Sequence, residues 1–173
     1  MRFNSLARSA VAAVAISMLG GAACAQSAAT QTTTSSGKII QPITLTAGSA
    51  LAFGTLVRPG TGSGTVTIDQ TSGARTVTGG VVGLASTATS RATYTVGGEG
   101  GQNFSISAPA TFNLTGPGVI TVTLTPSATS GTLSNAIGTA GTAAFGVGGN
   151  FTISSTTSTG VYSGVFDITV AYN

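Results

Sequence analysis

The side chains that could carry chemistry are few and far apart. The chain has no His, one Cys, and only three carboxylates, which belong to Asp69, Glu99 and Asp167. A Ser-His-Asp triad, a Cys-His pair and a His-containing metal site are therefore excluded. Three scattered carboxylates also do not supply the ligands of a Mg²⁺ or di-iron centre. The sequence predicts no catalytic residue, no metal ligand and no cofactor, and hence a protein that is not an enzyme.

Charge of either sign is sparse. Charged residues make up 5% of the 173 residues, against roughly a quarter in an ordinary soluble domain, while the apolar content of 41% is enough for a core. The three acids, together with Arg58, Arg75 and Arg91, are expected to face solvent. Because no basic patch is present, neither nucleic acid nor an anionic membrane is an expected partner.

The first 25 residues predict a signal peptide. Arg2 and Arg8 precede an apolar run from Ala10 to Leu19, and Ala23-Cys24-Ala25 supplies the small residues that a signal peptidase reads. We predict cleavage between Ala25 and Gln26. The protein is then exported from a Gram-negative-type bacterium, to the periplasm, the cell surface or the medium.

Cys24 leaves two interpretations open. It could accept a lipid anchor, but Gly21-Ala22-Ala23 lacks the large aliphatic residue expected three positions before a lipidated Cys. Removal of Cys24 with the signal peptide is the favoured interpretation. No later apolar run reaches the roughly 20 residues that span a bilayer, so no integral membrane segment is expected in the mature chain.

Two regions are expected after the signal peptide. Residues 26–37 are polar and without periodicity, which indicates a flexible leader. From residue 38 to 173, apolar and hydroxyl residues alternate with a period of two, which is typical of half-buried strands. The expected strands are 43–46, 65–69, 93–96, 103–106, 119–125, 150–154 and 165–172.

Glycine-rich turns separate these runs, so we predict one domain, an all-β, antiparallel, immunoglobulin-like β-sandwich. The cluster Gly97 to Gly101 is expected to form a hairpin turn rather than a phosphate cradle, because no helical pattern follows it. The segment from Ser127 to Thr142 is expected to be a long surface loop.

The C-terminal run is strongly apolar on one face. Phe166, Ile168, Val170 and Tyr172 share that face, and the sequence ends one residue later. Such a strand is either central in its sheet or an edge that pairs with another chain. We consider these four residues a candidate strand-pairing interface.

The start of the expected domain gives a second candidate. Ile39, Ile43 and Leu45 share a parity, and Pro42 cannot donate a ladder hydrogen bond, which suits an edge or intermolecular strand. This short run is either the first strand of its own domain or a donor strand that pairs with a neighbour through main-chain hydrogen bonds.

A family resemblance rests on four segments: Pro42 to Leu45, Leu51 to Leu56, Gly160 to Gly164, and Phe166 to Asn173. They resemble the bacterial domain-of-unknown-function family 4402 (DUF4402). More distantly, they are similar to spore coat protein U and to chaperone–usher pilin domains. The pilin resemblance implies an incomplete sandwich, in which a periplasmic chaperone and later a neighbouring subunit supply the missing strand.

The expected function is therefore that of an exported structural surface protein. Its partners would be a periplasmic chaperone and identical subunits, joined by strand addition for adhesion or biofilm formation. The alternative is a self-complete, monomeric surface module that binds carbohydrate or another ligand. The sequence identifies no aromatic platform and no cluster of polar groups for such a ligand.

Overall fold

The computed structural model describes residues 28–173, so the expected signal peptide, its cleavage site at Ala25 and Gln26, and Cys24 lie outside the described residues. The chain divides into two units after Gly37. Residues 28–37 contain no strand and are exposed throughout. Residues 38–173 carry the strands.

The second unit contains twelve described strands. Their bounds are β1 (Thr44–Ala47), β2 (Leu56–Val57), β3 (Ser63–Ile68), β4 (Arg75–Val77), β5 (Val82–Gly83), β6 (Ala92–Glu99), β7 (Asn103–Ser107), β8 (Thr111–Thr115), β9 (Val119–Pro126), β10 (Ser130–Thr132), β11 (Ala140–Ser154) and β12 (Thr169–Tyr172). All strand pairs found among residues 28–173 are antiparallel.

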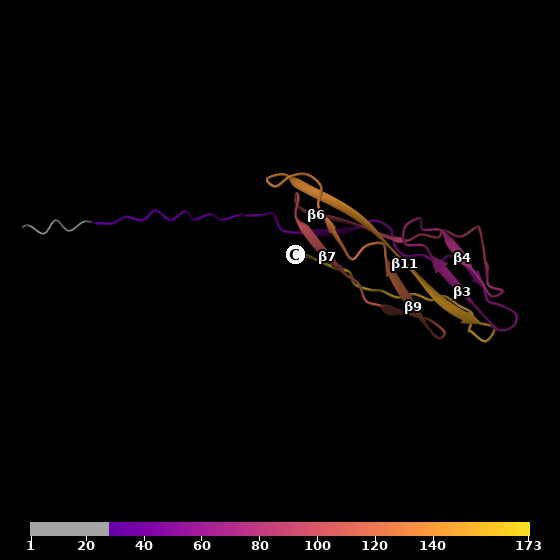
Figure 1. Cartoon of the computed structure of the whole chain (residues 1–173). Helices are drawn as coiled ribbons and strands as arrows, with labels where there is room; N and C mark the ends of the chain where they lie inside the picture. The colour runs from indigo at the N-terminus through magenta and orange to yellow at the C-terminus, as the bar shows by residue number, and fades with distance from the viewer. Residues whose placement is uncertain (1–27) are drawn as a thin grey trace, which may run out of the picture. The chain divides into compact units, whose positions relative to one another are not determined.

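The long strand β11 organises the larger sheet (Figure 1). Its first half pairs with β6, and its second half pairs with β3 on the same edge. The opposite edge pairs with β9 from Val147 to Asn150. The strand β1 extends the sheet beyond β6, β4 extends it beyond β3, and β8 pairs with β9.

A second sheet has the order β10-β7-β12, and β2 pairs with β5 in a short ribbon. The C-terminus lies beside β7 (Figure 1). Two hydrophobic clusters follow each other along β11. In the first cluster, Phe104 and Ile106 of β7 pack with Val96 of β6 and Val147 of β11. The three-stranded sheet thus covers the β6 side of the larger sheet.

Alternation of residue types explains the burial pattern. In β3, Val66 and Ile68 are buried, whereas Thr65 and Thr67 remain half-exposed. A period-two pattern places alternate side chains on opposite faces, so the apolar set forms the second cluster with Phe53, Val122, Phe151 and Ile153. Hydroxyl-bearing side chains cover the outer faces. The prediction of an all-β antiparallel sandwich is confirmed.

Two expectations about loops are wrong. The segment 127–142 contains β10 and the start of β11, and Leu133 within it is buried, because one large apolar residue among Gly, Ser and Thr is enough to hold it on the core. The turn at Gly97–Gly101 does not close a hairpin. Gly97 and Gly98 lie in β6, and β6 and β7 belong to different sheets.

Candidate functional site

An open groove lies on one side of the domain, between strands of the larger sheet and two irregular segments. Its volume is about 980 Å³, and its rims are the segments 47–56 and 157–166. Buried or half-buried apolar side chains line it: Tyr94, Phe112, Leu114, Ile120, Phe151 and Ile153. We call this feature the interlayer groove. Its floor is made of side chains that belong to, or pack against, the two core clusters.

Each rim of the interlayer groove is mostly irregular. The first rim contacts the residues before β6 through the isolated bridge Ala52↔Ser90. The second rim contacts the end of β8 through the isolated bridge Thr115↔Ser163. Two apolar residues on the second rim point outward, since Val161 is 87% exposed and Val165 is 91% exposed. These two side chains add exposed apolar surface beside the apolar lining of the groove.

The predicted strand-pairing residues lie next to this rim. Only Val170 and Tyr172 are in a strand, because regular pairing with β7 begins at Thr169. The side chains of Phe166, Ile168, Val170 and Tyr172 are half-buried and pack against the core cluster; Phe166 lies 4.9 Å from Phe112, ring centre to ring centre. Their apolar face is thus directed into their own domain.

What the C-terminal strand offers to a partner is its main chain. Among residues 28–173, β12 pairs with β7 alone and is therefore an edge. The Asn173 N–H donates to the Asn103 carbonyl at 3.1 Å. Bonded pairs alternate along an antiparallel ladder, so the peptide groups of Val170 and Tyr172 point to the free edge.

The three predicted donor residues are separated by the structure. Leu45 lies in β1 opposite Val96 of β6, and Ile43 packs against the core cluster. Ile39 is 97% exposed and lies before the first strand. Of the three, Ile39 is the one that remains exposed to meet another chain.

The two ends of the domain are joined by what we call the terminal clasp, formed by Gln41, Glu99 and Tyr172. The Tyr172 hydroxyl donates to the Gln41 carbonyl at 2.9 Å and accepts from the Glu99 N–H at 2.8 Å. A Glu99 carboxylate oxygen accepts from the Gln41 N–H at 3.3 Å. The ring fits because residue 98 is Gly, where a Cβ would overlap the tyrosine oxygen.

Sequence reasoning missed the clasp, because Glu99 was expected to face solvent. The same expectation was made for Arg75, which lies elsewhere in the domain. Glu99 is only 3% exposed, and its carboxylate accepts main-chain N–H groups of Gln41 and Gly138. The Arg75 guanidinium donates to the carbonyls of Phe53 and Leu84, both at 2.9 Å. Charges bonded to main-chain groups can be buried, and residue type alone does not reveal those partners.

Asp69 does face solvent, where it caps a turn. Its carboxylate accepts from the Ser72 N–H at 2.6 Å and from the Thr71 N–H at 2.9 Å. These bonds, that of the Ser72 N–H foremost, hold the pKa of Asp69 below its ordinary value of 3.8. The arrangement is that of a structural turn.

Replacing Tyr172 with Phe is expected to lower the free energy of unfolding by about 1–3 kcal/mol. The variant leaves the Gln41 carbonyl and the Glu99 N–H without their shared partner, and the Glu99 N–H lies in the part-buried portion of the clasp. The measurement is a urea denaturation curve of each purified protein.

Tyr162→Phe is the matched control for Tyr172→Phe. The Tyr162 hydroxyl makes one exposed bond, to the Ser158 carbonyl, so its loss should cost less. Equal losses in the two variants would show that the Tyr172 hydroxyl adds no more stability than the single exposed bond of Tyr162.

The described residues offer little other chemistry. Within 28–173 no group of three or more His, Cys, Asp or Glu side chains gathers in a way that could hold a metal ion. In the same part of the chain, no helix is long and apolar enough to cross a membrane.

The fold is that of an all-β sandwich domain with an open, apolar cleft on one side. Residues 43–172 match the family described as "Domain of unknown function (DUF4402)", so the chain belongs to that family. Comparison with curated proteins and with solved structures finds no match.

Proposed function

We propose that this protein is an exported, structural cell-surface protein that assembles by β-strand addition. The observation that carries the proposal is the interlayer groove of about 980 Å³, which is lined by buried and half-buried core residues between two incompletely paired rims. A strand laid in the groove would cover these side chains and bond to a rim through its main chain. Strand addition gains affinity from such main-chain bonds and register from alternate side chains.

The occupant we propose is the N-terminal segment of a second copy, residues 28–40. All of these residues are exposed, and none is in a strand. Extended at about 3.3 Å per residue, the segment reaches roughly 40 Å, which is longer than either ten-residue rim. Its large apolar residues are Ile39 and Ile40, and burial of one such side chain contributes about 1.5–3 kcal/mol.

The terminal clasp favours a donor from another molecule. Both main-chain groups of Gln41 are bonded inside the domain, its N–H to Glu99 and its carbonyl to Tyr172. The next residues continue directly into β1, which forms one side of the domain. The donor segment is thereby confined to residues before Gln41, so Ile43 and Leu45 have no donor role in this proposal.

The wider role follows from the expected signal peptide and the pilin resemblance. After cleavage between Ala25 and Gln26, a periplasmic chaperone would hold the interlayer groove until a second subunit replaces it. The assembled protein would serve adhesion or biofilm formation. The alternative is a self-complete protein that binds a ligand, and it predicts a monomer at every concentration.

The test is self-association of the full chain, purified from the periplasm of a Gram-negative host and followed by light scattering and negative-stain microscopy. We expect concentration-dependent oligomers or fibres. Ile39→Asp should weaken association at least tenfold, because it places a charge on the buried face of the donor strand.

Thr32→Asp is the matched control for Ile39→Asp. It adds the same charge to the same segment at the opposite parity, which faces solvent in a paired strand, and it should leave association nearly unchanged. A synthetic peptide of residues 28–42 should also bind the Ile39→Asp protein. A monomer at every concentration, with no peptide binding, would refute the proposal and favour the self-complete alternative.

A further inference from the structure

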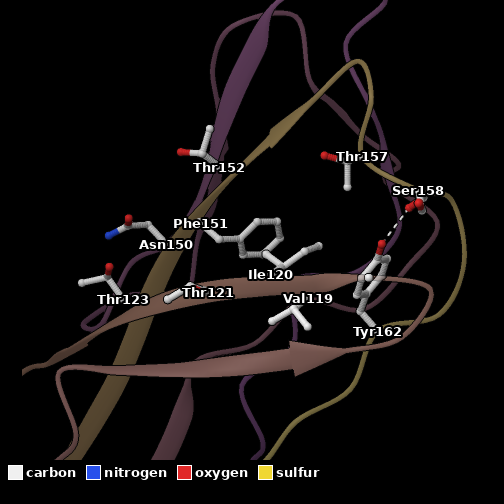
Figure 2. Close-up of a pocket in the computed structure, with 11 residues that line it drawn as sticks. Val119, Ile120, Thr121, Thr123, Asn150, Phe151, Thr152, Thr157, Ser158 and Tyr162 are labelled. Atoms are coloured by element: carbon white, nitrogen blue, oxygen red, sulfur yellow. Dashed lines mark hydrogen bonds between the residues drawn. The ribbon is translucent and has the colours of Figure 1, made fainter.

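A second, smaller cleft lies where β9 separates from β11. The two strands pair from Val147↔Pro126 to Asn150↔Thr123 and then diverge, while β11 continues along β3 to Ser154. Figure 2 shows the opening between them, with Tyr162 and Ser158 on its far side. We call this the β9–β11 cleft; its volume is about 400 Å³.

The strand edges that border the β9–β11 cleft present main-chain groups to it. The Ser155 N–H donates to Gly62 beside β3, so by alternation the peptide groups of Thr152 point away from β3, toward β9. On β9, the Leu124 N–H donates to the Ala110 carbonyl on the β8 side. Because the direction alternates from residue to residue, the peptide groups of Thr121 point the other way, toward β11. In the described ladder, neither residue has a partner across the cleft.

Polar and apolar side chains both line the cleft, and none of them carries a formal charge. Hydroxyl and amide groups come from Thr121, Thr123, Asn150, Thr152, Thr157 and Ser158. The apolar surfaces come from Val119, Ile120 and Phe151, and from the ring of Tyr162. The Tyr162 hydroxyl donates to the Ser158 carbonyl at 2.8 Å, which fixes the ring at the edge of the cleft (Figure 2).

We propose that the β9–β11 cleft binds a neutral saccharide of one or two rings. A sugar presents hydroxyls that both donate and accept, which suits Thr, Ser and Asn side chains and unpaired peptide groups. Its C–H faces suit the apolar surface of Tyr162 and Val119. None of the lining residues is Asp, Glu, Lys or Arg, so nothing in the cleft compensates a charged substituent. The volume lies in the usual range of small-molecule pockets.

This binding site is independent of strand addition, because it needs no second copy of the chain. Five residues line both the β9–β11 cleft and the interlayer groove: Ile120, Phe151, Thr157, Ser158 and Tyr162. The segment 157–162 thus separates the two cavities. A saccharide would rest against one side of this segment, and an added strand against the other.

The test is a titration of the ¹⁵N-labelled full chain, followed by its amide resonances. The probes are maltose, lactose, cellobiose and N,N′-diacetylchitobiose at millimolar concentration, with 3′-sialyllactose as the charged comparison. At least one neutral disaccharide should shift the amides of Thr121, Asn150 and Thr152. Thr123→Val should weaken this binding about three- to tenfold, the loss expected for one neutral hydrogen bond.

Thr76→Val is the matched control. Thr76 lies in β4 of the same sheet and is exposed like Thr123, but it is not part of the cleft. It should bind as the unmodified chain does. The proposal is overturned if no neutral disaccharide shifts the cleft amides, if Thr76→Val weakens binding equally, or if sialyllactose binds more tightly than every neutral sugar. Oligomers would broaden the amide resonances, so the titrations are made in the Ile39→Asp background, in which strand addition is weakened and Ile39 lies outside the cleft.

Discussion

Phe151→Ala is expected to lower the free energy of unfolding by about 3–5 kcal/mol, the usual cost of truncating a buried Phe. Phe151 is buried in the second core cluster, and its ring packs edge-on against Phe53 with ring centres 4.7 Å apart. The ring also lines the interlayer groove, so its removal joins a new cavity to an existing one. Domains of this size are stable by roughly 5–15 kcal/mol. The variant should therefore unfold at a much lower urea concentration.

Val161→Ala is the matched control for Phe151→Ala. Val161 lines the same groove from its rim, but it is 87% exposed. Its truncation should change the stability by less than about 0.5 kcal/mol. A similar, small loss in both variants would mean that the core around Phe151 is already loosely packed and that the groove extends through it.

Gly148→Ala is expected to cost about 3 kcal/mol, at the upper end of the range for overpacking. Gly148 lies where β11 passes from β6 to β3. A Cβ there would overlap the Ile68 carbonyl and lie 2.6 Å from the Gln70 nitrogen. Both are main-chain atoms, so relief requires a displacement of β3 itself. Thermal unfolding, followed by circular dichroism, is the measurement.

Gly60→Ala serves as the control for Gly148→Ala. A Cβ at Gly60 would meet no atom within 4 Å, so this variant should be neutral or slightly stabilising, because Ala restricts the unfolded chain. Comparable melting temperatures for the two variants would contradict the assigned register between β11 and β3.

The strands with clear alternation could be predicted from the sequence. In β3, β7 and β9, one side-chain parity is apolar and the other consists mostly of Thr, Ser or Asn, and those apolar residues are the buried ones. This works because period-two burial depends on local order alone. At the end of β11 and in the C-terminal run, the apolar residues of one parity are likewise the more buried ones.

The first half of β11 could not be predicted in this way. Residues 140–149 are rich in Gly and Ala, and this composition usually indicates a loop. Here small residues are needed because neighbouring main chains approach closely: a Cβ at Gly146 would overlap the Gln70 carbonyl. Such close approaches depend on strands distant in sequence.

The candidate sites depend on tertiary structure in the same way. The apolar parity of Phe166 to Tyr172 is visible in the sequence, but the direction of that face into its own domain is not. The interlayer groove arises from the spacing of two irregular segments, and the β9–β11 cleft from the divergence of two strands after Asn150. Neither spacing can be inferred from the residue types in these segments.

The terminal clasp also has a mechanical consequence. Gln41 and Tyr172 meet at one end of the domain, so a force applied between the chain's own termini would peel β1 and β12 from their neighbours one bonded pair at a time. A pull on Gln41 along the axis of β1 would instead shear that strand from β6. Its main-chain bonds to β6 lie perpendicular to the strand and would share that load together. The domain would therefore resist a pull along β1 far better than a pull that separates its two ends.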